Sequence, residues 1–318
     1  MTTATTTPLS LKELSKKPEQ LAGGHRLCAG CMHSVIVRQV LMAAEQPVLA
    51  SCATGCLEVA TSIHPYSAWR IPWIHSAFEN AAATASGMEA MFVSLKKQGK
   101  LPADADYRFI AFGGDGGTYD IGLQSLSGAL ERGHRMLYVC CDNGAYMNTG
   151  IQRSSATPLG ASTTTSPAGK VLPGKLQWRK DLARIVAAHN IPYVAQASPH
   201  NWLDLMKKVR KALAADGPSF INVLSTCHRG WRSKPSQAVA ILRPAVDSCY
   251  WPLFEIEDGK LTITYKPKAK VPVTEWLKLQ GRFAHLFKPA PNEAMLTAFQ
   301  ERVDFEWERL LRQESCGL

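Results

Sequence analysis

The segment from Arg108 to Gly150 constrains the fold of this 318-residue chain more than any other. Phe109 to Phe112 forms a compact apolar run, which is typical of a strand buried on both faces. A glycine-rich turn around Asp115 follows, and helically spaced apolar residues then extend from Ile121 to Leu130. Met136 to Cys141 forms a second apolar run. The order strand, turn, helix, strand predicts two neighbouring parallel strands of an α/β sheet.

The turns after these two strands predict a magnesium site. Asp115 follows the first strand and Asn143 follows the second, and parallel strands bring such turns together at the carboxyl edge of a sheet, where ligands bind. With the backbone carbonyl of Ala145 they form a hard oxygen set suited to Mg²⁺, which normally completes its shell with phosphate and water. This GDG…DN arrangement resembles the thiamine diphosphate signature, in which the metal holds the diphosphate of the cofactor. The alternative for a GDG triplet is a surface turn.

Strands alternate with helices along most of the chain, which predicts an α/β fold with a doubly wound, mostly parallel sheet and an extended C-terminal tail. We expect an N-terminal arm (1–24), an α/β domain (25–233) and a C-terminal extension (234–318) that packs on the core or on a partner subunit. Further strands are expected at Pro47–Ser51, Tyr193–Ala197 and Ser219–Ser225, and further helices at Leu9–Leu14, Val35–Ala44, Ala77–Leu95, Leu176–His189 and Asn201–Ala215. The remaining expectations are a structured loop (His64–His75), a long loop that acts as a lid or partner surface (Ser154–Gly174), a hairpin (Tyr250–Tyr265) and a terminal helix (Phe299–Arg312).

Composition excludes several classes of protein. No run approaches the roughly 20 apolar residues that cross a bilayer, and Met1 to Thr7 lacks the basic and apolar regions of a signal peptide, so a cytoplasmic location without membrane attachment is expected. The net charge is +10, but Lys and Arg are dispersed and no nucleic-acid-binding motif is present. We therefore expect no nucleic-acid partner, and attribute the charge to anionic cofactors, an acidic electron carrier or an acidic partner subunit.

Four of the nine cysteines form the second candidate constellation. Cys28 and Cys31 form a C-x2-C pair, Cys56 lies in the turn after a strand, and Cys227 follows the last predicted strand of the α/β domain. All four lie near a glycine, and glycine-rich backbone can direct N–H groups toward the sulfurs of a cluster. Four thiolates suit either an iron–sulfur cluster or a structural zinc ion. A thioredoxin-like pair needs no further cysteines, which argues against that interpretation.

Taken together, these motifs resemble the β subunits of the 2-oxoacid:ferredoxin oxidoreductases, and most closely those of the pyruvate type. The resemblance extends from Gly24 to about Phe287. The blocks that carry it are GHRLCAGC, ATGCLE, PWIHSAFENAAA, GGDGGTYDIG, DNGAYMNTGIQRS, TTTSP, the Gly230-Trp231 pair and LKLQGRF.

The resemblance implies the diphosphate-binding half of the thiamine diphosphate-binding fold. It implies that Cys28, Cys31, Cys56 and Cys227 hold a 4Fe–4S cluster beside the thiazolium ring, and that Asp115, Asn143 and the carbonyl of Ala145 hold Mg²⁺. It also implies that Gly114, Gly116 and Tyr146 line the cofactor, with Cys56 beside them, and that Asn148 lies near the reacting carbon. His75, in the PWIH block, is a candidate for packing against the cofactor.

The implied activity is oxidative decarboxylation of a 2-oxoacid, with pyruvate as the leading candidate, transfer of the acyl group to coenzyme A, and electrons passed to ferredoxin. Because one α/β domain is expected here, partner subunits of the α, γ and δ type would supply the pyrimidine-binding half and further clusters. Met32-His33-Ser34 departs from the small residues that pyruvate-type relatives have after the second cysteine, so oxalate or an aryl glyoxylate is an alternative substrate. Two other classes stay open: a non-redox thiamine enzyme subunit with a structural zinc site, and a non-catalytic scaffold subunit.

Overall fold

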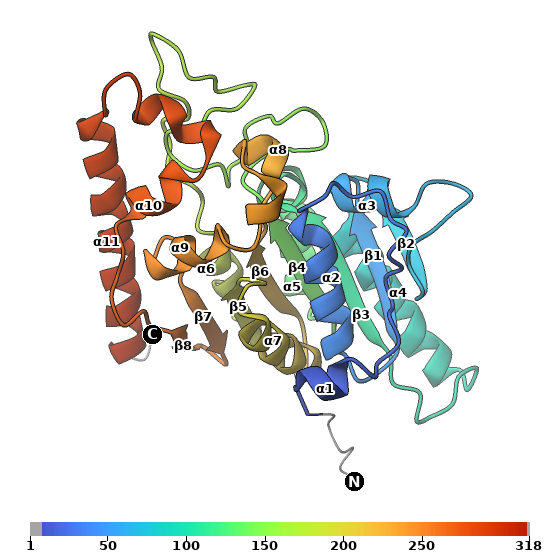
Figure 1. The fold of residues 1–318 in the computed structure, drawn as a ribbon. Helices are drawn as coiled ribbons and strands as arrows, with labels where there is room; N and C mark the ends of the chain where they lie inside the picture. Colours follow the sequence, from blue (N-terminus) through green and yellow to red (C-terminus); the bar gives the residue numbers. More distant parts are fainter. Residues whose placement is uncertain (1–7, 317–318) are drawn as a thin grey trace.

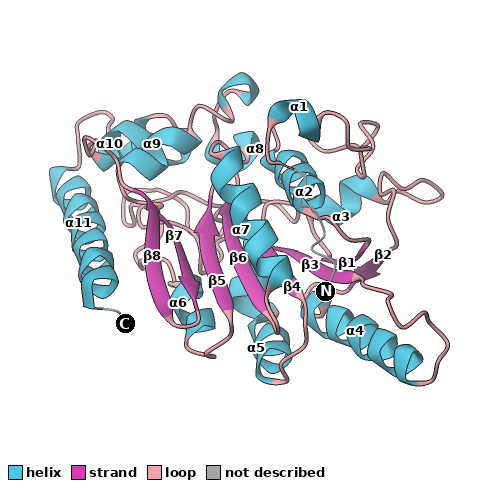
Figure 2. Cartoon of the chain, turned by 90° about the horizontal axis from the view of Figure 1, so that it is seen from below, coloured by secondary structure: helices cyan, strands magenta, loops and turns pink. Residues whose placement is uncertain are grey.

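An eight-stranded sheet forms the centre of the molecule, with strands in the order β2-β1-β3-β4-β6-β5-β7-β8 (Figures 1 and 2). The computed structural model describes residues 8–316. The first six strands in this order (β2, β1, β3, β4, β6 and β5) run parallel to one another. At the far edge, β7 pairs antiparallel with β5, and β8 pairs antiparallel with β7. The strands are β1 (Val48–Ala53), β2 (Trp73–Ser76), β3 (Arg108–Gly114), β4 (Leu137–Asp142), β5 (Tyr193–Ala197), β6 (Ser219–Leu224), β7 (Leu253–Glu257) and β8 (Lys260–Tyr265).

Helices cover both faces of this sheet, so the predicted doubly wound fold is confirmed (Figure 2). One buried cluster joins the sheet to α2 (Met32–Ala43) and α7 (Trp202–Ala214), and a second joins it to α4 (Ala81–Lys97) and α5 (Leu123–Glu131). The other helices are α1 (Leu11–Leu14), α3 (Cys56–Thr61), η1 (Gly116–Ile121), α6 (Leu182–Ala187), α8 (His228–Trp231), η2 (Pro235–Gln237), α9 (Leu242–Asp247), α10 (Val273–Lys278), η3 (Gly281–Leu286) and α11 (Glu293–Cys316).

The central strands form because most of their residues are apolar, on both faces of the sheet. Every residue of β4 and of β6 is buried, as expected for parallel strands between two helical layers. Cys140 and Cys141 of β4 and Cys52 of β1 are buried at 0–1% exposure and behave as small apolar side chains there.

The predicted helix before β5 and the predicted loop before β2 differ from the structure. The helix expected at Leu176–His189 is present only as α6, because the Asp181 carboxylate accepts a hydrogen bond from the N–H of Arg184 and caps the helix at that point. The loop expected at His64–His75 ends in the edge strand β2, which pairs with β1 through four residues.

The C-terminal part of the chain is continuous with the sheet. The predicted hairpin is present as β7 and β8, and β7 pairs with β5. Helix α11 is longer than predicted and packs along β8 at the far end of the sheet from β2 (Figure 1).

The long loop expected at Ser154–Gly174 is free of regular structure, its first part is buried, and its role as a lid or partner surface stays a prediction. Residues 156–158 and 160–163 are buried, whereas Val171 is 91% exposed. In the N-terminal arm, Leu21 is fully buried and bridges to Trp69. The expectation about Met1 to Thr7 lies outside the described residues. Within residues 8–316, no helix is both long enough and apolar enough to span a bilayer.

Candidate functional site

The turns after β3 and β4 meet at one edge of the sheet. The two strands pair in parallel, with Gly114 opposite Cys141. The N–H of Asn143 donates a hydrogen bond of 3.1 Å to Oδ1 of Asp115. The predicted convergence of these two residues therefore occurs in the structure.

The amide of Asn143 completes a set of three oxygens. The amide atom that faces Asp115 lies 2.9 Å from Oδ1 of Asp115 and 2.9 Å from the carbonyl oxygen of Ala145. If this atom is Nδ2, it donates to both oxygens. If it is Oδ1, three oxygens face one another, and Nδ2 then lies 3.4 Å from Nε2 of His33. A cation between the oxygens would stabilise that second arrangement.

The spacing of these atoms fits magnesium. Mg²⁺ prefers an octahedron with bonds of 2.0–2.1 Å, and the edge of such an octahedron is about 2.9 Å. The donor set, one carboxylate, one amide and one carbonyl, is also the hard oxygen chemistry that Mg²⁺ favours. The residues present therefore fit the ion that the sequence predicts.

Asp115 is strongly held within the protein. It is 1% exposed, and its second oxygen, Oδ2, accepts a hydrogen bond of 2.6 Å from Oγ of Ser154. Burial, reinforced by the nearby charge of Asp142, raises the pKa of the metal-free Asp115 carboxyl to about 8. A bound cation would favour the ionised form and would remove this penalty.

Glycines leave space beside Asp115. A Cβ atom added at Gly116 would lie 2.5 Å from the ring of Tyr146, so this ring packs directly on the glycine. A Cβ atom added at Gly114 would meet nothing within 4 Å, so open space adjoins Gly114. Most of the predicted cofactor-binding residues line one pocket: Cys56, Gly114, Asp115, Gly116, Asn143, Ala145, Tyr146 and Asn148, together with His33.

His75 is the predicted cofactor residue that does not line this pocket. It lies on the edge strand β2, and its Nε2 is 2.9 Å from Oγ1 of Thr54, which does line the pocket. His33, in contrast, is 4% exposed and faces the pocket from the first turn of α2. Burial lowers the pKa of His33 to about 4, so its ring is neutral at physiological pH.

Three of the four candidate cysteines begin helices. Cys31 and Cys227 are the N-cap residues of α2 and α8, and Cys56 is the first residue of α3. Cys28 is exposed, and its carbonyl accepts a hydrogen bond of 3.0 Å from the N–H of Cys31. The N–H of Gly230 donates to the sulfur of Cys227 at 3.4 Å, as the nearby glycine predicts.

The four thiols influence one another electrostatically. Burial, together with the charges of Cys227, Cys31, Cys28 and Asp115, raises the pKa of Cys56 to about 12. The cysteines therefore lie near one another and near the magnesium motif. Within the described range of the chain, no group of three or more His, Cys, Asp or Glu side chains is arranged to hold a single metal ion. A four-iron cluster keeps its thiolates farther apart than one ion does, and the four thiols are the soft donor set that such a cluster requires.

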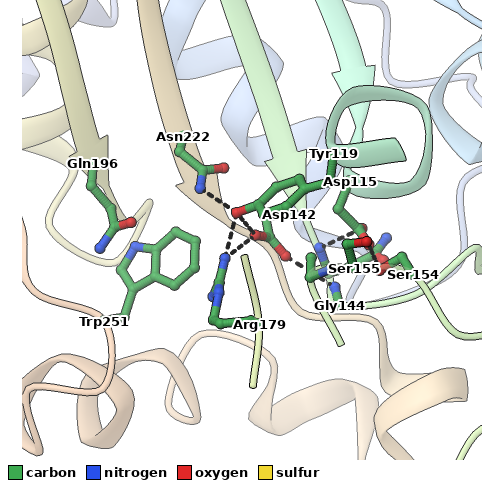
Figure 3. A network of polar contacts seen from close by, with 12 residues as sticks. Asp115, Tyr119, Asp142, Gly144, Ser154, Ser155, Arg179, Gln196, Asn222 and Trp251 are labelled. Carbon is green, nitrogen blue, oxygen red and sulfur yellow. Dashed lines mark hydrogen bonds and ion pairs between the residues drawn. The ribbon is translucent and has the colours of Figure 1, made fainter. Parts of the chain in front are cut away.

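A buried polar network beside the site was not predicted (Figure 3). Nη2 of Arg179 lies 2.5 Å from Oδ2 of Asp142, and the hydroxyl of Tyr119 donates to the same oxygen at 2.6 Å. The amide of Asn222 donates to the Tyr119 hydroxyl at 2.6 Å, and the N–H of Gly144 donates to Oδ1 of Asp142 at 3.1 Å. This network fixes the turn that carries Asn143. Its only sequence signal is the buried aspartate before Asn143, since Arg179 comes from an irregular segment.

Comparison with known proteins agrees with this geometry. The family described as the C-terminal TPP-binding domain of thiamine pyrophosphate enzymes matches residues 53–223. The pyruvate synthase subunit PorB of Thermotoga maritima is 52% identical over 96% of this chain and 97% of that protein. PorB of Methanocaldococcus jannaschii is 54% identical over 85% and 91%, and the ketoisovalerate oxidoreductase subunit VorB of Pyrococcus abyssi is 43% identical over 92% of each chain.

A solved structure of 2-oxoglutarate:ferredoxin oxidoreductase from Magnetococcus marinus shares the fold, with a TM-score of 0.54 at 21% identity over 71% of this chain and 80% of that one. The sequence-based expectations of family and fold class are thus confirmed. This chain belongs to the thiamine pyrophosphate-dependent 2-oxoacid:ferredoxin oxidoreductases, as a β subunit of the pyruvate synthase PorB type.

Proposed function

We propose that this chain holds the diphosphate of thiamine diphosphate through Mg²⁺ and also carries a 4Fe–4S cluster. With partner subunits it would oxidatively decarboxylate a 2-oxoacid, pass the acyl group to coenzyme A and send electrons to ferredoxin. The observation that carries this proposal is the buried triad of Asp115, Asn143 and Ala145. The side-chain amide atom of Asn143 lies 2.9 Å from Oδ1 of Asp115 and 2.9 Å from the carbonyl oxygen of Ala145, and the triad lies near four thiols.

The triad would bind the ion, and the pocket would receive the cofactor. Asp115, Asn143 and the Ala145 carbonyl would supply three ligands, and the diphosphate would supply others. The open space beside Gly114 would let phosphate approach the backbone, while the Tyr146 ring, packed on Gly116, would form one wall. Asn148, which is exposed in the pocket lining, would donate a hydrogen bond from its side-chain amide to the substrate carbonyl oxygen. When bound, thiamine diphosphate supplies the electron sink needed to release CO₂ from a 2-oxoacid.

Cys28, Cys31, Cys56 and Cys227 would hold the cluster, which supplies one-electron transfer. The residues of this chain would tune the cluster mainly through N–H groups directed at sulfur, as the N–H of Gly230 is directed at Cys227. The competing possibility is a structural zinc ion. Metal analysis of the purified complex separates the two, because the cluster predicts about four irons and matching sulfide for this site, and zinc predicts neither.

Pyruvate is the proposed substrate because PorB relatives named as pyruvate synthase subunits are about half identical to this chain over most of its length. His33 lies in the segment that departs from the pyruvate type, and its neutral ring faces the pocket. A panel of pyruvate, 2-oxoisovalerate, oxalate and phenylglyoxylate, assayed with the intact complex, would identify the substrate. A higher kcat/KM for oxalate or phenylglyoxylate than for pyruvate would reverse this assignment.

Partner subunits of the α, γ and δ type are part of the proposal. The described chain holds the residues for the diphosphate end of the cofactor, and a second domain would have to supply the pyrimidine half and the clusters that relay electrons to ferredoxin. The purified chain, reconstituted with iron, sulfide, Mg²⁺ and thiamine diphosphate, is therefore expected to release no CO₂ from pyruvate alone. Release at a rate similar to that of the complex would contradict this part of the proposal.

The decisive experiment is Asp115→Asn in the intact complex. We expect loss of bound thiamine diphosphate and Mg²⁺ and loss of activity, with iron and sulfide content unchanged. Asp258→Asn, a substitution of the same type at an exposed turn, is the matched control and should retain all four components. Normal cofactor content in Asp115→Asn would exclude the proposed site, and normal activity would favour a scaffold role.

A further inference from the structure

Arg282 is a buried cation without an anionic partner. It lies in η3, within the C-terminal extension, and is 2% exposed. Within residues 8–316, its side chain forms one hydrogen bond, from Nε to Oε1 of Gln280 at 2.9 Å, and no carboxylate lies within ion-pair distance. The rings of Trp231, Trp276 and Phe283 lie over its guanidinium but carry no net charge. A buried cation without a paired anion is costly, so such a residue normally faces an anion.

The guanidinium of Arg282 lies against the helix that begins at Cys227. Its Cζ is 4.4 Å from the ring centre of Trp231, the last residue of α8. The indole N–H of that tryptophan donates to the carbonyl oxygen of Asn143 at 2.7 Å. On the other side, Nη1 lies beside Gly144, where an added Cβ atom would approach it to 3.1 Å. Arg282 is therefore placed between the Cys227 loop and the magnesium motif.

The other negative charges nearby already have partners. Asp142 is paired with Arg179 at 2.5 Å, and Asp115 accepts hydrogen bonds from Ser154 and Asn143. The sulfur of Cys227 accepts the N–H of Gly230 at 3.4 Å, and Cys227 is the N-cap of the short helix whose last residue, Trp231, packs on Arg282. Burial lowers the pKa of Arg282 only to about 10, so the guanidinium stays protonated at neutral pH.

We propose that Arg282 raises the reduction potential of the cluster held by Cys28, Cys31, Cys56 and Cys227, by placing one buried positive charge beside Cys227. This inference rests on the proposed function. Four thiolates around a core of two positive charges leave a net charge of −2, and one-electron reduction makes it −3. A fixed positive charge in a poorly hydrated interior stabilises the reduced state more than the oxidised state. Arg282 acts by placing a charge near the cluster, so it is a positioning residue and not a catalytic residue.

The test is a redox titration of the intact complex, followed by electron paramagnetic resonance. The signal of this chain's cluster is the one lost in a Cys56→Ala variant. Arg282→Gln removes the charge, Arg282→Lys retains it, and Arg232→Gln is the control, since it removes a solvent-exposed charge from the residue that follows α8. We expect the Arg282→Gln midpoint to fall by about 59 mV, which is a tenfold change in the one-electron equilibrium. Arg282→Lys should show less than half of this shift, and Arg232→Gln almost none.

The outcomes separate this inference from the proposed function. A wild-type complex without iron at this site would exclude the cluster itself. If the cluster is present but Arg282→Gln and Arg232→Gln have the same midpoint, or Arg282→Gln and Arg282→Lys shift equally, the charge of Arg282 does not tune it. Loss of the cluster in Arg282→Gln but not in Arg282→Lys would support a requirement for the charge. Loss in both variants would show that packing is the role, and would overturn the proposal.

Discussion

Oγ of Ser154 donates a hydrogen bond of 2.6 Å to Oδ2 of Asp115, although the two residues are 39 positions apart. The contact occupies the oxygen that faces away from Asn143 and fixes the rotation of the carboxylate. Oδ1 is then directed at the Asn143 amide, where the proposed ion would bind. The long loop that contains Ser154 therefore holds the Asp115 carboxylate in the orientation needed to bind the proposed ion.

Ser154→Ala should weaken binding of Mg²⁺ and thiamine diphosphate by about 10- to 100-fold, because groups that orient metal ligands have effects of this size. Calorimetric titration of the cofactor-depleted complex with thiamine diphosphate at fixed Mg²⁺ would measure it. Ser315→Ala, at an exposed position on α11, is the matched control and should leave the affinity unchanged. Equal affinities for the two variants would mean that Asp115 needs no second support.

Gly114 and Gly116 flank Asp115 and should respond differently to alanine. At Gly116 the new methyl group would lie 2.5 Å from the Tyr146 ring, so Gly116→Ala should destabilise even the cofactor-free protein by about 1–3 kcal/mol. At Gly114 the methyl group meets nothing within 4 Å, so Gly114→Ala should leave the cofactor-free melting temperature nearly unchanged.

Gly114→Ala should instead weaken the binding of thiamine diphosphate. The open space there is the space assigned to the diphosphate, so thiamine diphosphate should bind much more weakly and should raise the melting temperature less than in the wild type. Thermal unfolding with and without cofactor compares both variants in one experiment. An undiminished cofactor-induced rise in Gly114→Ala would place the diphosphate elsewhere.

Much of this architecture follows from local sequence signals. β3 and β4 are marked by apolar runs ending in polar turns, and the parallel order brings Asp115 and Asn143 together without any further information. The three oxygens of the magnesium motif could be named for the same reason. Cys227 could be joined to the other cysteines because it lies near a glycine and also follows a strand, β6, at the same edge of the sheet.

Other features depend on contacts between distant segments that carry no periodic pattern. Ser154 and Arg179 lie in an irregular segment, and nothing in its composition indicates that they contact Asp115 and Asp142. Arg282 belongs to the C-terminal extension, and only the packing of η3 on Trp231 brings it to the site. The sequence pattern before β5 also predicted a helix longer than α6, because the start of α6 is set by a single side chain, the capping carboxylate of Asp181.

The ion pair of Arg179 and Asp142 should contribute to folding as well as to the site. The two side chains are 11% and 2% exposed, so Arg179→Gln would leave a buried carboxylate without its cation. We expect a loss of about 3–5 kcal/mol in the free energy of unfolding, measured by urea unfolding. Arg312→Gln breaks an exposed pair with Glu308 and should cost at most about 1 kcal/mol. Similar costs for the two substitutions would mean that Tyr119 and Gly144 suffice to hold Asp142.

The protonation state of the cluster cysteines should be measurable once the cluster has been removed. Burial raises the pKa of Cys31 and of Cys56 to about 12, so both are protonated thiols at neutral pH in the metal-free chain. Because only the thiolate reacts with iodoacetamide, their alkylation should accelerate about tenfold per pH unit from pH 7 to 10, with no plateau below the pKa. Mass spectrometry of peptides from the cluster-free chain would follow each site, with the exposed Cys316 as the accessible reference that reacts first. A plateau near pH 8 for Cys31 or Cys56 would mean that these thiols are more hydrated than the structure indicates, and protection of both in the loaded complex would confirm that they are ligands.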